Sequence, residues 1–223
     1  MQILDKSHLG VIEEPYPWFE EIINTVTHGV GIVLSVIALV LLILRGLSCV
    51  PSEILTPSLV GFAIYGVSLI LVYTSSTFYH AVPFSAAKQL LCVLDQCAIF
   101  LLIAGSYSAF CLSVLYGPLG ISLFIVIWTL AFAGILSLIA FRNKIRWITM
   151  SLYLFMGWLV LFAAVPVFQS MNWLTVSMVI AGGVAYTVGF VFFSMKYWWA
   201  HPVWHLFVLG GSAFQYVAIY FLY

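Results

Sequence analysis

The sequence contains very few charged side chains. Only 6% of its 223 residues are Asp, Glu, Lys or Arg, and the seven acidic and seven basic residues cancel at neutral pH. Soluble globular domains contain about 25% charged residues, so the composition excludes a water-soluble globule. Without an excess of positive charge, the chain also lacks the basic surface on which binding to nucleic acid depends.

Cysteine is scarce as well. The four cysteines, at positions 49, 92, 97 and 111, show no CxxC spacing, and most of them lie in apolar stretches. A disulfide framework is therefore not expected.

Most residues of the chain are apolar. They make up 65% of the chain, and the mean hydropathy is +1.18. A helix needs about 20 apolar residues to cross a membrane, and the strands of a transmembrane barrel would alternate instead. Seven apolar stretches have the required length: 25–44, 59–82, 90–115, 119–141, 147–168, 173–195 and 202–223. The sequence therefore predicts an all-α, polytopic membrane protein, a bundle of seven transmembrane helices.

The first 20 residues differ from the rest because they are polar and acidic and contain Pro15 and Pro17. We expect residues 1–20 to form a short cytoplasmic or interfacial segment and residues 21–223 to form one transmembrane domain. The first apolar stretch lacks the basic region that precedes the apolar core of a signal peptide, which indicates that it is retained.

The basic residues predict the orientation, because cytoplasmic loops carry an excess of Lys and Arg. A cytoplasmic N-terminus leaves Arg45 alone outside. It puts the other basic residues in inner loops: Lys6, Lys88, Arg142, Lys144, Arg146 and Lys196. We therefore expect a multi-pass protein of the cell membrane whose N-terminus lies in the cytoplasm and whose C-terminus lies outside.

Four ionisable residues within apolar stretches share one depth in this topology. His80 ends the second stretch and Asp95 lies early in the third, while His201 and His205 open the last stretch on one face of a helix, with Pro202 in its first turn. All four would lie towards the cytoplasmic side. Ionisable side chains are costly inside a membrane and usually mark a functional site.

Three imidazoles and a carboxylate suit a zinc ion. We predict that His80, His201 and His205 are zinc ligands, and that Asp95 either binds zinc or holds the zinc-bound water and takes its proton. Zinc lowers the pKa of such a water to about 7, which makes a nucleophile available at neutral pH. Ser76, one turn before His80 on the same face, could orient the water or stabilise an oxyanion.

Each of these residues also has a simpler interpretation. A single membrane histidine usually hydrogen-bonds to a neighbouring helix, Ser76 could bond to the backbone, and Asp95 could form a proton relay with a histidine without any metal. In the first helix, Glu21, Asn24 and His28 share one face. The carboxylate favours the positive end of the helix dipole, and we interpret the three as a supporting network.

Taken together, these motifs resemble the haemolysin III branch of the progestin and adipoQ receptor family. The resemblance covers the chain from about residue 20 to its end. It rests on three motifs in the expected order: Glu21, Asn24 and His28; Ser76 and His80 followed by Asp95; and His201 and His205 followed by Leu209, Gly210 and Gly211.

The resemblance implies more than the composition does. It implies a seven-helix protein with a cytoplasmic N-terminus and a zinc ion near the inner leaflet, held by residues that match His80, His201 and His205, with Asp95 contacting the zinc-bound water. Relatives in the wider superfamily are associated with ceramide amide hydrolysis. Bacterial members are linked to haemolysis and membrane lipid homeostasis, and the short tail and leader of this chain look bacterial.

Two functions remain open from the sequence. The first is a zinc-dependent, ceramidase-like hydrolase that cleaves a lipid amide or ester whose acyl chains lie between the helices. The second is a non-enzymatic membrane sensor or a cytolytic, haemolytic protein in which the metal is structural. The expected partners are membrane lipids, including a lipid substrate within the bundle, and neither nucleic acid nor a protein partner is indicated.

Overall fold

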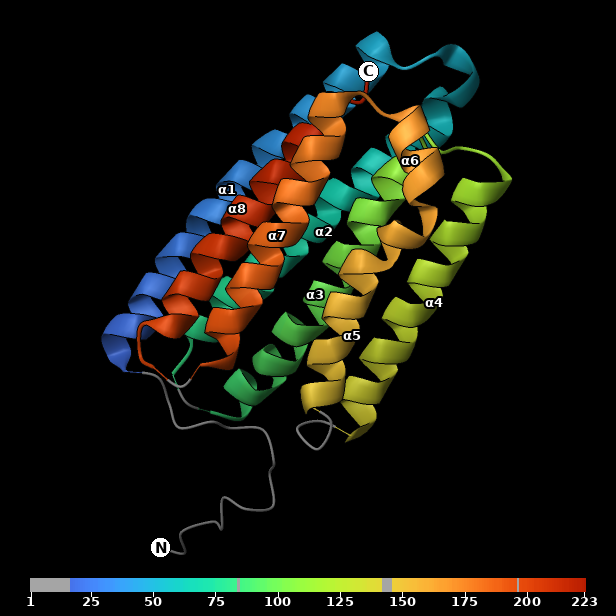
Figure 1. Ribbon diagram of the computed structural model, residues 1–223. Coiled ribbons are helices and arrows are strands. Elements are labelled where there is room, and N and C mark those ends of the chain that lie inside the picture. Colours follow the sequence, from blue (N-terminus) through green and yellow to red (C-terminus); the bar gives the residue numbers. More distant parts are fainter. Residues whose placement is uncertain (1–16, 84, 142–145, 196) are drawn as a thin grey trace, which may run out of the picture.

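The described part of the protein is entirely helical and forms an elongated bundle (Figure 1). The computed structural model describes residues 17–83, 85–141, 146–195 and 197–223. Its elements are α1 (Trp18–Cys49), the 3-10 helix η2 (Ser52–Ile54), α2 (Leu55–Ala81), α3 (Ala86–Cys111), α4 (Pro118–Phe141), α5 (Arg146–Trp158), the 3-10 helix η4 (Leu159–Ala163), α6 (Ala164–Ser170), α7 (Trp173–Ser194) and α8 (Ala200–Tyr220).

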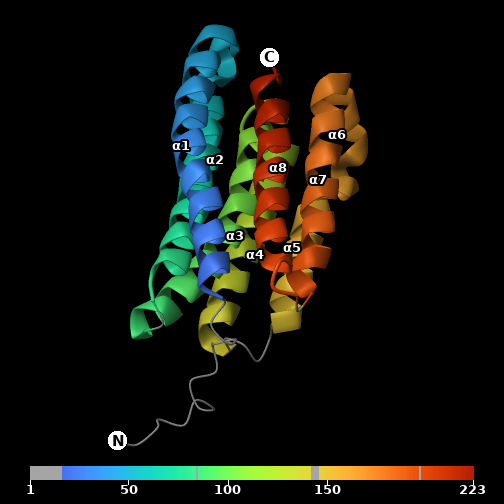
Figure 2. The same cartoon turned by 90° about the vertical axis from the view of Figure 1, so that its left-hand side faces the viewer.

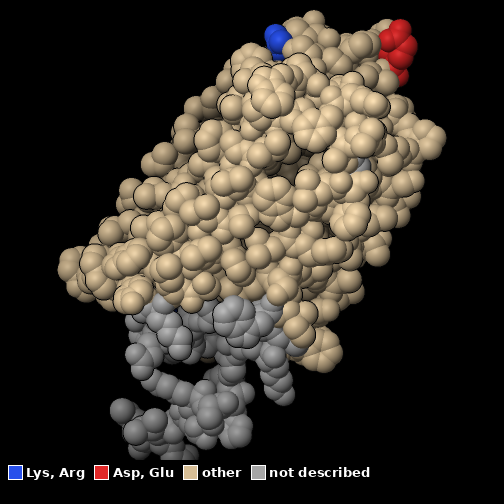
Figure 3. Space-filling view, in the orientation of Figure 1, with Lys and Arg blue, Asp and Glu red and all other residues tan. Residues whose placement is uncertain are grey.

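The helices have the length and composition of membrane spans. Within the described ranges, six are long and apolar enough to cross a bilayer, and the bent pair formed by α5 and α6 makes a seventh if it counts as one span. Large apolar side chains face outward, as Val33, Ile37 and Leu44 do on α1. On the face in Figure 3, the described atoms carry charge only at one end. The prediction of an all-α, polytopic membrane protein is confirmed.

The fifth apolar stretch is not the single straight helix that its composition predicts. α5 passes through η4 into α6 with a bend of 64°. Pro166 explains the break, because proline has no N–H for the carbonyl oxygen of Phe162 and its ring clashes with that turn. The segment before it tightens into the 3-10 helix η4 instead.

The termini of four helices lie at one end of the bundle. α1, α3 and α8 begin there and α2 ends there, at the lower end in Figure 1, with the same arrangement from the side in Figure 2. We call it the histidine end, because His80 and His201 lie in these helix termini. The last residues of the chain lie at the opposite end.

Local sequence signals set these termini. α1 begins directly after Pro17, and α2 stops two residues before Pro83. The Ser85 hydroxyl caps α3 by accepting from the backbone N–H of Lys88 at 3.3 Å. α8 begins at Ala200, so Pro202 lies in its first turn. A backbone N–H there would have no partner within the helix, so proline costs no hydrogen bond.

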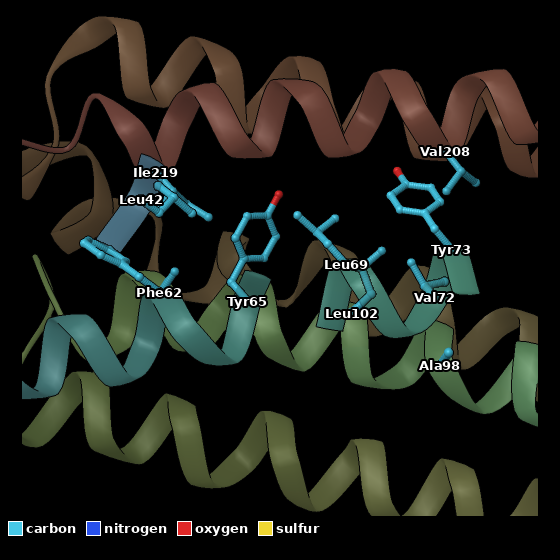
Figure 4. Close-up of a cluster of buried hydrophobic side chains, with 11 residues drawn as sticks. Leu42, Phe62, Tyr65, Leu69, Val72, Tyr73, Ala98, Leu102, Val208 and Ile219 are labelled. Atoms are coloured by element: carbon cyan, nitrogen blue, oxygen red, sulfur yellow. The ribbon is translucent and has the colours of Figure 1, made fainter. Parts of the chain in front are cut away.

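The core lies where α1, α2, α3 and α8 meet. α2 packs along α1 and α3, α8 packs along α7, and α1 contacts α8. The buried cluster there includes Phe62, Tyr65 and Tyr73 of α2, and Figure 4 shows Tyr73 beside Val208 of α8. Tyr65 donates to the backbone carbonyl of Ser212 at 3.1 Å, which links α2 to α8, the helices that carry His80, His201 and His205.

The predicted orientation and the first predicted segment depend largely on residues outside this description. Lys6, Arg142, Lys144 and Lys196 lie outside the described residues, as does most of 1–20. α1 itself begins at Trp18, before the predicted start of the transmembrane domain at residue 21.

Candidate metal centre

Three imidazoles meet at the histidine end of the bundle. His80 is the penultimate residue of α2, and His201 and His205 lie one turn apart at the start of α8. His80 and His205 are buried, with 2% and 1% of their surface exposed. Because α2 and α8 both pack against α1, residues more than 120 positions apart share one small volume.

The facing atoms are the Nε2 nitrogens. Nε2 of His201 lies 3.3 Å from Nε2 of His80 and 3.1 Å from Nε2 of His205. A tetrahedral ion bound to imidazole nitrogens at about 2.0–2.1 Å requires nitrogens roughly 3.3 Å apart. Potential ligand atoms of the three residues all lie within 4.8 Å of one another, so the group could hold a metal ion.

The other ring nitrogen of His80 has its own partner. Nδ1 of His80 lies 2.6 Å from Oε2 of Glu21, which α1 contributes. A carboxylate accepts hydrogen bonds only, so Nδ1 carries the proton and the lone pair of Nε2 faces the other histidines. A carboxylate behind a ligand histidine is the arrangement that fixes ring orientation at many metal sites.

The other two residues of the predicted supporting network also reach the histidines. His28 is 3% exposed and stacks on His205, with ring centroids 3.7 Å apart and planes 14° from parallel. Its ring also makes a T-shaped contact with Tyr73, with centroids 5.0 Å apart. Asn24 is fully buried, and its Nδ2 lies 3.5 Å from Nδ1 of His80. The stripe on α1 therefore backs the site rather than pointing to lipid.

Ser76 and Asp95 form a second polar pair nearby. Ser76 is 1% exposed and lies one turn before His80, and its hydroxyl is within hydrogen-bonding reach of the Asp95 carboxylate on α3. Asp95 is not among the three residues whose ligand atoms cluster. Its assignment as a ligand or as a base that holds water stays a prediction, as does the role of Ser76.

Lys88 is the residue that the sequence analysis misplaced. It was expected in an inner loop as a topology signal, but it lies in the first turn of α3 and is 7% exposed. Its Nζ donates to Oε1 of Glu21 at 2.7 Å and to the carbonyl oxygens of Tyr79 and Val82 at 2.9 and 3.1 Å. Position relative to an apolar stretch cannot reveal such a contact, because the partners come from α1 and α2.

An apolar cavity lies within the bundle, next to the site but not open to it. It lies between α3, α5, α7 and α8, and its lining includes Tyr153, Tyr186 and Val208. Phe193 and Trp204 line it as well. The Phe193 ring also contacts His201, with centroids 5.8 Å apart, so an aromatic side chain separates the cavity from the histidines.

Comparisons with known proteins find similar chains in bacteria. The model of the family described as "Haemolysin-III related" matches residues 16–216. The chain is 40% identical to "Hemolysin-3" of Bacillus cereus, with 91% of each chain covered, and 39% identical to the "Hemolysin-3 homolog" of Bacillus subtilis (strain 168), with 91% of this chain and 93% of that protein covered.

A more distant similarity reaches animal proteins. The chain is 30% identical to the human "Monocyte to macrophage differentiation factor" over 70% of its own length and 68% of the relative's. This similarity supports the link between the bacterial proteins and the progestin and adipoQ receptor family. The chain belongs to the haemolysin-III-related family, as a multi-pass membrane protein whose three histidines could hold a metal ion.

Proposed function

We propose that this protein binds zinc through His80, His201 and His205 and hydrolyses an amide or ester bond of a membrane lipid at the cytoplasmic side of the bilayer. The observation that carries the proposal is the convergence of three imidazoles beside an apolar cavity, with the Phe193 ring between the two.

The donor set favours zinc over other common ions. Imidazole nitrogen suits zinc, whereas calcium and magnesium prefer oxygen ligands. Three protein ligands leave a fourth position open, which is typical of catalytic zinc rather than structural zinc. A zinc ion bound there would polarise a carbonyl oxygen and activate water at neutral pH.

The neighbouring residues supply the remaining parts of a hydrolase. Asp95 is the carboxylate that would accept a proton from the attacking water, and Ser76 holds that carboxylate through its hydroxyl. A positioned general base contributes about 10²- to 10⁴-fold to a rate. The same carboxylate could then return the proton to the leaving amine or alcohol.

The cavity supports a lipid as the substrate. Its described lining is uncharged and mostly aliphatic or aromatic, so an acyl chain could enter it without leaving a charge unpaired. A chain that passes Phe193 and Trp204 would bring its carbonyl group towards His201.

Metal analysis combined with lipidomics tests the proposal. Wild-type protein purified in detergent should contain about one zinc ion per chain, and His205→Ala should contain far less. Cells that express each protein are then compared for lipids. A fatty acid and its amine or alcohol partner should rise only with the wild type, and unchanged lipids beside a zinc-loaded protein would contradict the hydrolase.

A structural metal is the second candidate, and one observation favours it. The histidines come from α2 and α8, so an ion between them would cross-link two helices that are distant in the sequence. The names of the Bacillus relatives describe an effect on membranes rather than a reaction. This candidate predicts that chelation lowers the unfolding temperature while no lipid product forms at any metal loading.

A further inference from the structure

Glu21 is held from two sides at the histidine end of the bundle. Its Oε2 faces Nδ1 of His80 at 2.6 Å, and its Oε1 accepts from Nζ of Lys88 at 2.7 Å. The two side chains that hold it come from α2 and α3, whereas Glu21 belongs to α1. Both carboxylate oxygens are therefore fixed by partners on other helices.

Lys88 is in turn fixed to the turn of helix that carries His80. Beyond Glu21, its ammonium group donates to the carbonyl oxygens of Tyr79 and Val82, which flank His80 in the sequence. An ammonium group has three protons, and these three acceptors use all of them. Carbonyl oxygens at the end of a helix also attract a positive charge.

The network forms a closed path through three helices. It runs from the end of α2 through Lys88 and Glu21 and returns to the ring of His80, whose side chain is fully buried. The side chains of Glu21 and Lys88 are only 16% and 9% exposed. Buried ions are costly unless they are paired and hydrogen-bonded, so two such residues are hard to explain as a surface ion pair.

We infer that Glu21 and Lys88 act as positioning residues for the metal centre: the pair holds His80 with its Nδ1 protonated and its Nε2 aimed at the ion. The inference rests on the proposed zinc site and adds to it the device that preorganises one ligand. A carboxylate behind a ligand histidine typically changes metal affinity 10- to 100-fold.

A groove lies against this network on the outside of the bundle. Glu21, His80 and Lys88 line it between the beginning of α1 and the end of α2, together with Trp18 and Pro83. The side chains of Glu21 and Lys88 keep a small exposed surface, whereas that of His80 has none.

The test measures zinc affinity of the full chain in detergent by competition with a chromophoric chelator. Glu21→Gln, which keeps the size but cannot act as a charged acceptor, should bind zinc 10- to 100-fold more weakly than wild type. Lys88→Met should weaken binding less, because Glu21 remains. Lys88→Arg should bind nearly as tightly as wild type, and the double variant Glu21→Gln/Lys88→Met should match Glu21→Gln alone.

Glu20→Gln is the matched control. Glu20 precedes Glu21 in the first turn of α1 and is 1% exposed, and its carboxylate oxygens have no hydrogen-bond partner among the described residues. The substitution makes the same carboxylate-to-amide change one residue away at the same end of α1, where no described residue bonds to the side chain, so it should leave zinc affinity unchanged.

A spectroscopic signature separates positioning from general stability. Cobalt(II) in place of zinc absorbs visible light according to its ligand geometry. We expect an altered cobalt spectrum for Glu21→Gln and a wild-type spectrum for Glu20→Gln and Lys88→Arg. If Glu21→Gln is not monodisperse, Lys88→Met takes its place, with a smaller loss of zinc affinity expected against Lys88→Arg as its control.

Two results would overturn the inference in distinguishable ways. If wild type binds zinc and Glu21→Gln binds it equally well with the same cobalt spectrum, the pair does not position His80 and the proposed zinc site stands. If wild type itself binds no zinc, the proposed function fails and the inference fails with it.

Discussion

The histidine end and the cavity between α3, α5, α7 and α8 use opposite chemistry within one bundle. At the histidine end, buried imidazoles, a carboxylate and an ammonium group lie within hydrogen-bonding distance of one another. The described residues that line the cavity carry no charge. The first region is specified by polar contacts between helices, and the second by the shape of apolar side chains.

This contrast predicts that the two regions can be disrupted separately. Substitutions at the histidine end should change metal binding or chemistry while the bundle stays folded. Substitutions in the cavity or at helix contacts should change lipid preference or stability while the metal stays bound.

The largest effect is expected from loss of a histidine that faces the other two. His80→Ala removes one of three converging nitrogens and the partner of Glu21, and should abolish stoichiometric metal binding in the purified protein. His28→Ala removes a ring that stacks on His205 but lies outside the ligand group, so it should weaken metal binding without abolishing it. Full metal content in His80→Ala, measured by mass spectrometry, would contradict the assignment.

Asp95→Asn should separate binding from reaction. Because Asp95 is not among the clustered ligand atoms, the variant should keep its metal while hydrolysis falls about 10²- to 10⁴-fold, the usual contribution of a general base. Release of fatty acid from a synthetic amide lipid measures the rate. If Asp95→Asn lost its metal instead, Asp95 would be a ligand.

A smaller and selective effect is expected from filling the cavity. Gly183 lines it, and a Cβ there would meet the Trp158 ring at 3.4 Å. Gly183→Leu should narrow the cavity at a cost of about 1–3 kcal/mol for over-packing and reduce turnover of long-chain lipids more than of short-chain ones. Equal losses for all chain lengths would indicate that acyl chains do not occupy this space.

The smallest functional effect is expected from a helix contact away from both regions. A Cβ on Gly61 would lie 2.6 Å from the backbone oxygen of Ser108, so Gly61→Ala must push α2 and α3 apart. It should lower the free energy of unfolding by about 1–3 kcal/mol without loss of metal, as measured by thermal unfolding in detergent. Gly29→Ala, where a Cβ meets nothing within 4 Å, should not destabilise the protein.

Several features could be predicted from local patterns because their cause is local. The apolar stretches predict membrane helices, since a helix satisfies its own backbone within the bilayer. The spacing of His201 and His205 puts both on one face of α8, and Pro202 predicts their place in its first turn. The bend at Pro166 was not predicted, although a proline within an apolar stretch is a local signal for one.

The contacts of Glu21 and Lys88 could not be read from the sequence in the same way. Glu21 was assigned to a supporting network and Lys88 to a loop, yet they meet at 2.7 Å although 67 positions separate them. No periodicity links residues at the starts of two different helices. Which of their polar side chains meet is determined by how α1, α2 and α3 are aligned along the axis of the bundle.

By itself, the sequence determined that this chain folds into membrane helices and that three histidines, a serine and an aspartate lie near helix ends, because hydropathy and helical spacing are properties of short segments. The tertiary structure decided which nitrogen of each histidine faces the others and which carboxylate stands behind His80. It also decided that Ser76 pairs with Asp95. These contacts depend on how α1, α2, α3 and α8 pack, and packing is set by side chains distributed over the whole bundle rather than by any single segment.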